Sequence, residues 1–159
     1  MPEMDVDEAR RRFSGARIAR LATVDHEGRP HLVPVVFALC DSIGDEIVMA
    51  VDGKPKRSQR LKRLHNIEVN PAVCLLVDAY DEDWNRLWWV RADGGARVVP
   101  PGAPDPEARD GYAEAVAALR RKYGQYREHP PDGPVTVVGV LRWSGWRAGS
   151  EEDAAGPAG

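Results

Sequence analysis

The sequence predicts a mainly β protein, a β-barrel of about six antiparallel strands with flanking helices. Three observations support this prediction. Six segments rich in apolar, β-branched and aromatic residues are separated by turn-forming residues. Few segments carry apolar residues at helical spacing. The runs IVMAV, AVCLLV and VTVVGVL are apolar on both faces, and an antiparallel sheet with two apolar faces needs cover on both sides.

The first third of the chain predicts a short helix and an antiparallel meander. Residues 5–13 read as a helix, because Asp5 is a suitable N-cap and Glu8 follows three positions later. The turn signals DHEGRP and CDSIGDE separate the next three apolar segments. Strands are therefore expected at 17–24, 31–39 and 46–51.

The rest of the chain predicts two more helices and three more strands. A helix is expected at about 55–66, where Pro55 suits the first helical position. A proline-rich loop precedes a second amphipathic helix. Asp93-Gly94 is a hairpin signal, but one kinked or bulged strand is preferred there. The expected ranges are strands at 72–80, 87–99 and 134–147, the loop at 100–108 and the helix at 109–123.

Length and composition indicate one cytoplasmic domain. The chain has 159 residues, of which 43% are hydrophobic, and no run is long enough to span a membrane or to act as a signal peptide. Residues 1–148 are expected to form the domain and 149–159 a disordered acidic tail. Cys40 and Cys74 lie in apolar runs, so they read as packing residues.

A dense basic cluster is the strongest functional signal. The run KPKRSQRLKR (54–63) contains six positive charges, although the whole chain has a net charge of −3. The cluster opens a predicted helix, where free backbone N–H groups also favour an anion. Lys56, Arg57 and Arg60 fall within two turns and can converge on one phosphate, unless the run is merely a solvated helix face.

Tryptophan provides the second signal. Of five tryptophans, Trp84, Trp88 and Trp89 lie around the start of one strand, and Trp143 and Trp146 lie near the chain's end. Because adjacent strand residues point to opposite faces, at most one of Trp88 and Trp89 belongs to the barrel interior. The other is expected to meet a helix, a partner subunit or a planar ligand.

Several chemistries lack a sequence signal. The four histidines show no HxxH or HExxH spacing, there is no GxSxG, and no GxGxxG follows a strand. The acids in DAYDED (78–83) lack an EF-hand pattern and read as a solvated turn, so no metal site is expected. The basic cluster lacks interleaved aromatic residues, which argues against a nucleic-acid partner.

The segments GRPHLVPVVFAL, KPKRSQRLKRLHNIEVNPAVCLLVDAYDEDW and LWWVRADGGARVV resemble the pyridoxamine-phosphate-oxidase-like class of deazaflavin (coenzyme F420)-dependent oxidoreductases. The closing HPPDGPVTVVGVLRWSGW is similar to that family's last strand, and the resemblance covers about residues 13–147. It implies a split β-barrel of the FMN-binding, flavin-reductase type, assembled as a homodimer with two cofactor sites at the interface. Vitamin-B6 chemistry is disfavoured, because the end SGWRAGSEEDAAGPAG lacks the arginine-containing substrate motif of the oxidases proper.

The resemblance also implies the cofactor-binding residues. The backbone of Pro34, Val35, Val36 and Phe37 would lie along the tricyclic ring. The phosphate would be held by Lys54, Lys56, Arg57 and Ser58, with Arg60 and Arg63 matching the pattern less closely. Trp88 or Trp89, together with Trp146, would come from the other side of the interface.

We therefore expect an F420-dependent reductase that passes a hydride to an electron-poor, unsaturated small molecule, with the cofactor supplying the chemistry. No catalytic side chain is identified, which fits the lack of a catalytic constellation. Two alternatives stay open. One is an FMN-dependent reductase or oxidase on the same fold, and the other is a non-catalytic flavin- or deazaflavin-binding dimer.

Overall fold

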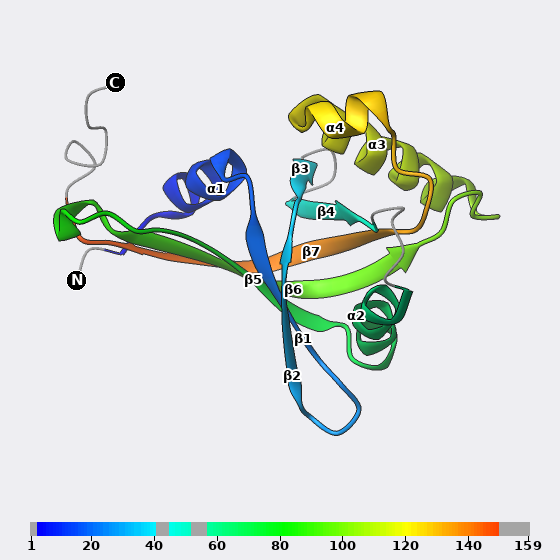
Figure 1. Cartoon of the computed structure of the whole chain (residues 1–159), viewed down its shortest axis with the longest axis horizontal. Coiled ribbons are helices and arrows are strands. Elements are labelled where there is room, and N and C mark those ends of the chain that lie inside the picture. The colour runs from blue at the N-terminus through cyan, green and yellow to red at the C-terminus, as the bar shows by residue number, and fades with distance from the viewer. Residues whose placement is uncertain (1–2, 41–44, 52–56, 150–159) are drawn as a thin grey trace.

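The computed structural model describes residues 3–40, 45–51 and 57–149, and it describes residues 57–61 by their helical backbone only. Lys54, Lys56 and the acidic tail from residue 150 onward lie outside the described residues. No helix of the described part is long and apolar enough to cross a membrane. Figure 1 shows one long, strongly curved sheet with helices at its ends and flanks.

The described part of the chain contains four consecutive strands near its start and then helices and strands in mixed order. In order, they are α1 (Val6–Gly15), β1 (Ala19–Val24), β2 (Pro30–Val35), β3 (Ala38–Cys40), β4 (Glu46–Ala50), α2 (Arg57–Val69), β5 (Ala72–Ala79), the 3₁₀ turn η1 (Trp84–Arg86), β6 (Trp88–Val99), α3 (Pro106–Lys122), α4 (Gly124–Glu128) and β7 (Val135–Arg147).

The strands form one antiparallel sheet in the order β2-β1-β5-β6-β7-β4-β3, which confirms the mainly β fold with flanking helices. The sheet has seven strands because the expected strand 31–39 is divided into β2 and β3. These halves lie at opposite edges of the sheet and are joined directly through Val36 and Phe37. The barrel is therefore split: the hydrogen-bonded ladder is not closed, and the chain itself connects its two edges.

Strand β6 crosses the Asp93-Gly94 signal without turning. Its pairing with β7 continues on both sides of a bulge between Asp93 and Gly94. A Cβ at Gly94 would collide with the carbonyl oxygen of Gly139, so this position needs glycine for close backbone approach. The preference for one bulged strand over a hairpin is confirmed.

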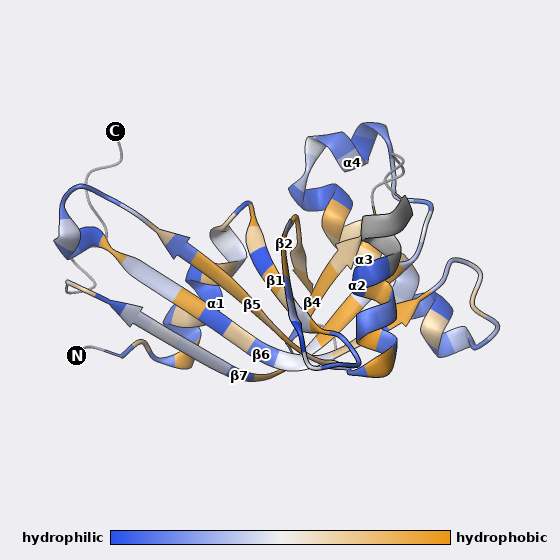
Figure 2. Cartoon of the chain, turned by 60° about the horizontal axis from the view of Figure 1, so that its bottom comes forward, coloured by the Kyte–Doolittle hydropathy of each residue, from blue (hydrophilic) through white to orange (hydrophobic). Residues whose placement is uncertain are grey.

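Two cores lie on opposite faces of the sheet. The inner core lies in the concave side under α1, and Phe13 contacts both Phe37 and Trp143 there, with ring centroids 4.8 and 5.1 Å apart. The outer core lies between α3 and the β3–β4–β7 region and includes Val48, Leu119 and Val135. In Figure 2, β4 and β5 are largely hydrophobic, whereas α4 is mostly hydrophilic.

The helices begin where side chains satisfy their free N–H groups. Asp5 accepts from the Glu8 backbone N–H at 2.7 Å and begins α1, as the sequence predicts. Asp105 accepts from the Ala108 N–H at 3.1 Å and Pro106 occupies the first turn, so α3 begins at 106 and not at 109. The last residues of the expected loop 100–108 therefore belong to α3.

Candidate functional site

One tyrosine side chain stabilises the interruption between β2 and β3 at Val36 and Phe37, called the break below. The Tyr123 hydroxyl accepts the backbone N–H of Phe37 at 3.1 Å and lies 2.9 Å from the carbonyl oxygens of Phe37 and Arg17, to one of which it donates. The polar backbone of Phe37 is thus satisfied by a side chain in place of a strand partner. Tyr123 fixes the point at which the chain leaves one edge of the sheet for the other.

A cavity of about 190 Å³ lies at this break. Pro34, Val35 and Val36 form one wall, whereas Phe37, the fourth residue expected along the ring, is buried in the inner core and does not line the cavity. That a cofactor ring lies along this wall stays a prediction. The remaining lining residues are Ile18, Ala50 and Arg63. Because β2 is an edge strand, one side of its backbone faces no ladder partner among the described strands.

Helix α2 brings Arg63, the last residue of the basic cluster, to this cavity. Its anchor is a buried hydrogen bond of 3.1 Å from the Asn66 side-chain amide to the Thr23 hydroxyl, and Ile67 enters the inner core. Arg63, one turn earlier, lines the cavity, and the helix begins at Arg57. Arg57, Ser58 and Arg60 therefore lie in the first turns of α2, although the contacts of their side chains are outside the described part.

The tryptophans lie on another part of the sheet. Trp89 and Trp146 are directly opposite each other across β6 and β7, and Trp89 is also opposite Asp78 on β5. Trp88 packs against the inner core with the Arg12 guanidinium 5.2 Å from its ring centroid. The alternation of the two adjacent tryptophans between faces is confirmed.

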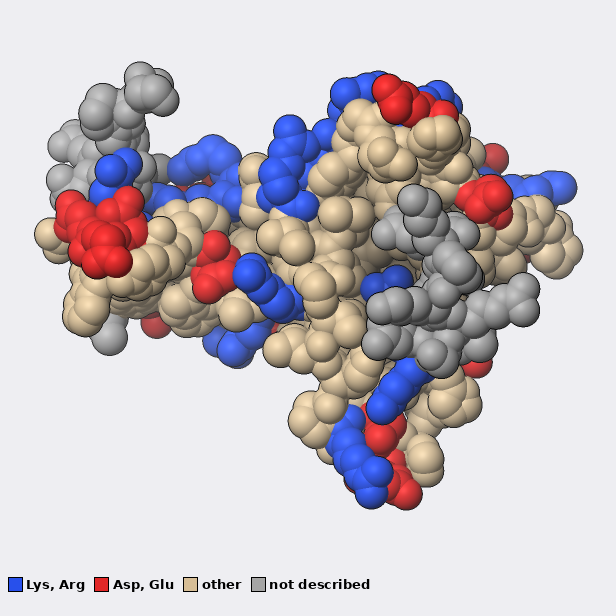
Figure 3. Space-filling view, in the orientation of Figure 1, with Lys and Arg blue, Asp and Glu red and all other residues tan. Residues whose placement is uncertain are grey.

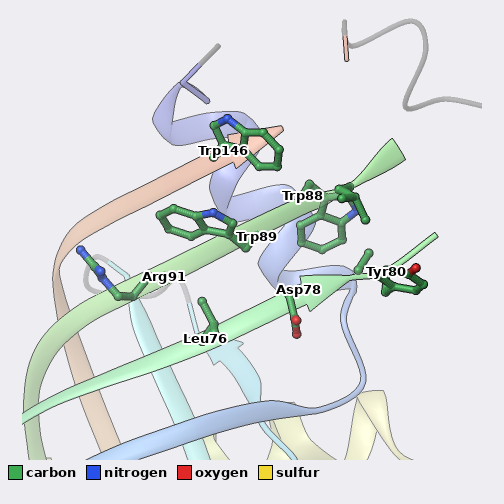
Figure 4. A pocket seen from close by; sticks show the side chains of 9 residues that line it. Leu76, Asp78, Tyr80, Trp88, Trp89, Arg91 and Trp146 are labelled. Atoms are coloured by element: carbon green, nitrogen blue, oxygen red, sulfur yellow. The ribbon is translucent and has the colours of Figure 1, made fainter. Parts of the chain in front are cut away.

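A shallow cavity of about 430 Å³ borders Trp88, Trp89 and Trp146, and Figure 4 shows the Trp89 and Trp146 rings beside each other above Leu76. In the described part of one chain, the cavity beside these tryptophans and the cavity beside segment 34–36 have no lining residue in common. Their meeting across a dimer interface stays a prediction.

A larger cavity of about 790 Å³ also borders the break. Val36 and Tyr123 belong to its wall, so it adjoins the expected ring position. The other lining residues are Val51, Gln125, Tyr126, Glu128, His129, Pro130, Pro131 and Asp132. Sequence reasoning gave His129 and α4 no role, and the only signal available was the proline pair that follows them.

The acidic segment before β6 forms a capped turn. The Asp81 carboxylate accepts the Asp83 N–H at 2.8 Å, and the Asp83 carboxylate accepts the Asn85 N–H at 3.1 Å, which begins η1. Within the described ranges, no group of three or more histidine, cysteine, aspartate or glutamate residues could hold a metal ion. These acids therefore stabilise backbone, in agreement with their reading as a solvated turn.

Residues 6–147 match the family model of pyridoxamine 5'-phosphate oxidase, and the chain belongs to that family. Solved structures share its fold. A FAD-binding protein from Mesorhizobium loti superposes with a TM-score of 0.65 at 17% identity, covering 91% of this chain and 95% of that one. A conserved hypothetical protein from Mycobacterium tuberculosis gives 0.64 at 20% identity, with coverages of 91% and 86%. A heme storage protein from Vibrio cholerae gives 0.62 at 16% identity, with coverages of 91% and 95%.

Proposed function

We propose that the protein binds reduced coenzyme F420 and passes a hydride to an electron-poor, unsaturated small molecule. The observation that carries this proposal is the cavity at the β2–β3 break, which is lined by the backbone of an edge strand and by Arg63, the last residue of the basic cluster. This arrangement offers a flat, largely apolar wall to a ring and positive charge to its phosphate-bearing tail.

The cavity residues fit a flavin-like ring. The wall from Pro34 to Val36, with Ile18 and Ala50, presents apolar surface together with backbone polar groups. Its volume of about 190 Å³ is below the roughly 300–1,000 Å³ of cavities that enclose a ligand of this size. One chain therefore provides half of a site, and a second surface must complete it.

The start of α2 suits the phosphate. Free N–H groups of the first helical turn and the positive end of the helix dipole favour an anion there. The cluster from Lys54 to Arg63 adds six positive charges in ten residues, more than one terminal phosphate requires. That excess suits the long acidic tail of the deazaflavin cofactor.

A second copy of the chain is the proposed source of the completing surface. The outer face of β2, β1, β5 and the adjoining part of β6 and β7 is covered by none of the described helices. It exposes Leu32 and Leu141, which are 66% and 86% accessible, and carries Trp89 and Trp146. A twofold dimer would cover this face and bring its tryptophans to the partner's break.

When bound, the reduced deazaflavin would supply the hydride. The residues of this chain would orient the cofactor ring and enclose the substrate. The wall 34–36 would fix the ring plane, and the adjoining 790 Å³ cavity has room for a substrate beside it. Solvent can deliver any proton, since no side chain is assigned that task.

Two other functions remain supported. The FAD-binding protein from Mesorhizobium loti has the same fold, which favours an FMN- or FAD-dependent reductase or oxidase as the runner-up. The heme storage protein from Vibrio cholerae has the same fold, which favours a ligand-binding protein as a further alternative. A spectrum recorded while each cofactor is titrated distinguishes these functions, and reduction of an acceptor distinguishes an enzyme from a carrier.

The experiment that tests the site compares two variants. Lys56→Ala combined with Arg57→Ala should weaken F420 binding well over tenfold, because each charge-assisted phosphate contact contributes roughly 1.5–3 kcal/mol. Arg120→Ala removes one exposed charge from α3, outside the cluster, and should change binding less than twofold. Binding by the double variant within twofold of the wild type, with folding intact, would exclude the cluster as the phosphate site.

A further inference from the structure

A second basic pocket lies where the ends of α1 and α3 meet β3. Its volume is about 440 Å³, and it shares no lining residue with the cavity at the β2–β3 break or with the 790 Å³ cavity. The pocket is lined by Ser14, Gly15, Arg17, Ala38, Leu39, Ala118, Arg121 and Lys122. In Figure 3, basic side chains gather between α1 and the α3–α4 region.

Three cations line this pocket without an acidic residue. Among the salt bridges of the described part of the chain, none involves Arg17, Arg121 or Lys122. Arg17 donates one hydrogen bond of 2.7 Å to the Lys122 carbonyl oxygen, which positions its guanidinium and leaves its other N–H donors for a ligand.

The Lys122 amine is the most unusual group of the pocket. It is shielded from solvent, and no hydrogen-bond acceptor reaches it within the described residues. It lies 3.8 Å from the ring centroid of Phe37 and 5.4 Å from that of Tyr123. Burial, together with the nearby Arg17 charge, lowers the pKa of Lys122 to about 8. An ammonium group held without an anionic partner is unfavourable, and a bound anion would relieve this.

We propose that this pocket binds the phosphate group of a small phosphorylated molecule, at a site separate from the cofactor phosphate. The Arg17 and Arg121 guanidinium groups can each donate paired hydrogen bonds to phosphate oxygens, and the Ser14 hydroxyl lies on the same wall. The Lys122 ammonium can turn toward the anion on its flexible stem. Ala38, Leu39 and Ala118 leave apolar room for the organic part.

The test follows backbone amide resonances while inorganic phosphate or phenyl phosphate is added at constant ionic strength. Saturable shifts are expected at Gly15 and Leu39. Arg121→Gln should weaken binding about tenfold or more, because it removes a charge-assisted phosphate contact. Arg120→Gln removes the same charge from an exposed neighbour on α3 that does not line the pocket, so it should change binding less than twofold.

The cofactor cluster provides a second control. Lys56→Ala with Arg57→Ala should leave phosphate binding at Gly15 and Leu39 within twofold, whether or not that variant binds F420. The proposal is overturned if millimolar phosphate produces no saturable shift at these amides. It is also overturned if Arg120→Gln weakens binding as much as Arg121→Gln does, because the effect would then be general charge attraction.

Discussion

Replacing Tyr123 with phenylalanine tests whether a single hydroxyl stabilises the break between β2 and β3, which lines the 190 Å³ cavity. The substitution keeps the ring and removes only the oxygen that accepts the Phe37 N–H and donates to a carbonyl. A buried polar group left without its partner costs about 1–3 kcal/mol. We therefore expect the free energy of unfolding to fall by about 2 kcal/mol, or about 4–8 °C in Tm for a domain of this size.

The assay is urea unfolding combined with hydrogen exchange at the Phe37 amide. Exchange at Phe37 should accelerate more than at Leu75, which lies in the middle of the sheet and makes no contact with the hydroxyl. Tyr80→Phe is the matched control, because Tyr80 is 71% exposed and its hydroxyl only meets Glu82 at 3.4 Å. An unchanged stability and an unchanged Phe37 exchange rate in Tyr123→Phe would refute this explanation of the break.

Three further predictions concern ionisation and assembly. The pKa of Lys122 is lowered from its ordinary value of 10.5 to about 8 in the folded protein, so between these two pH values the unfolded chain binds more protons than the folded one. The free energy of unfolding of the wild type should therefore rise with pH across that window, and that of Lys122→Met should not. The hydrogen bond from Arg10 lowers the pKa of Asp45, so the stability that this bond contributes should be lost as the pH falls through the lowered pKa. In urea titrations, the free energy of unfolding of Asp45→Asn should depend less on acidic pH than that of the wild type. Sedimentation should show a dimer at micromolar concentration without cofactor, and Leu32→Glu with Leu141→Glu should weaken it; a well-folded wild-type monomer would contradict the proposed interface.

Much of the fold follows from local sequence signals. The Asp5 N-cap begins α1, and the alternation of Trp88 and Trp89 between faces follows from strand geometry alone. The sequence also contains the signal for the start of α3, because Asp105-Pro106 combines an N-cap with a proline in the first turn. Reading the proline-rich segment as loop to 108 missed that signal.

The division of strand 31–39 had no local signal. Val36 and Phe37 both favour strands, and at the break the Phe37 N–H donates to the hydroxyl of a tyrosine 86 positions away along the chain. The same holds for the burial of Lys122, since a lysine in the last turn of a helix ordinarily points into solvent. Such features arise from tertiary packing, which a local pattern does not encode.

For the candidate site, the structure brings only part of the expected set of residues together, and their binding of a cofactor stays a prediction. Segment 34–36 and the basic helix do meet, through Arg63, at the break. Trp88, Trp89 and Trp146 line a separate cavity, and their meeting with segment 34–36 across a dimer interface stays a prediction.

The central claim is that the site is built for the deazaflavin cofactor, and calorimetric titration with F420 and with FMN tests it most directly. Six positive charges in ten residues should attract the longer acidic tail of F420 more strongly than the single phosphate of FMN. We predict tighter binding of F420 than of FMN at low salt, with the difference shrinking as salt screens the tail. Equal or tighter binding of FMN at low salt would contradict the claim and favour an FMN-dependent function.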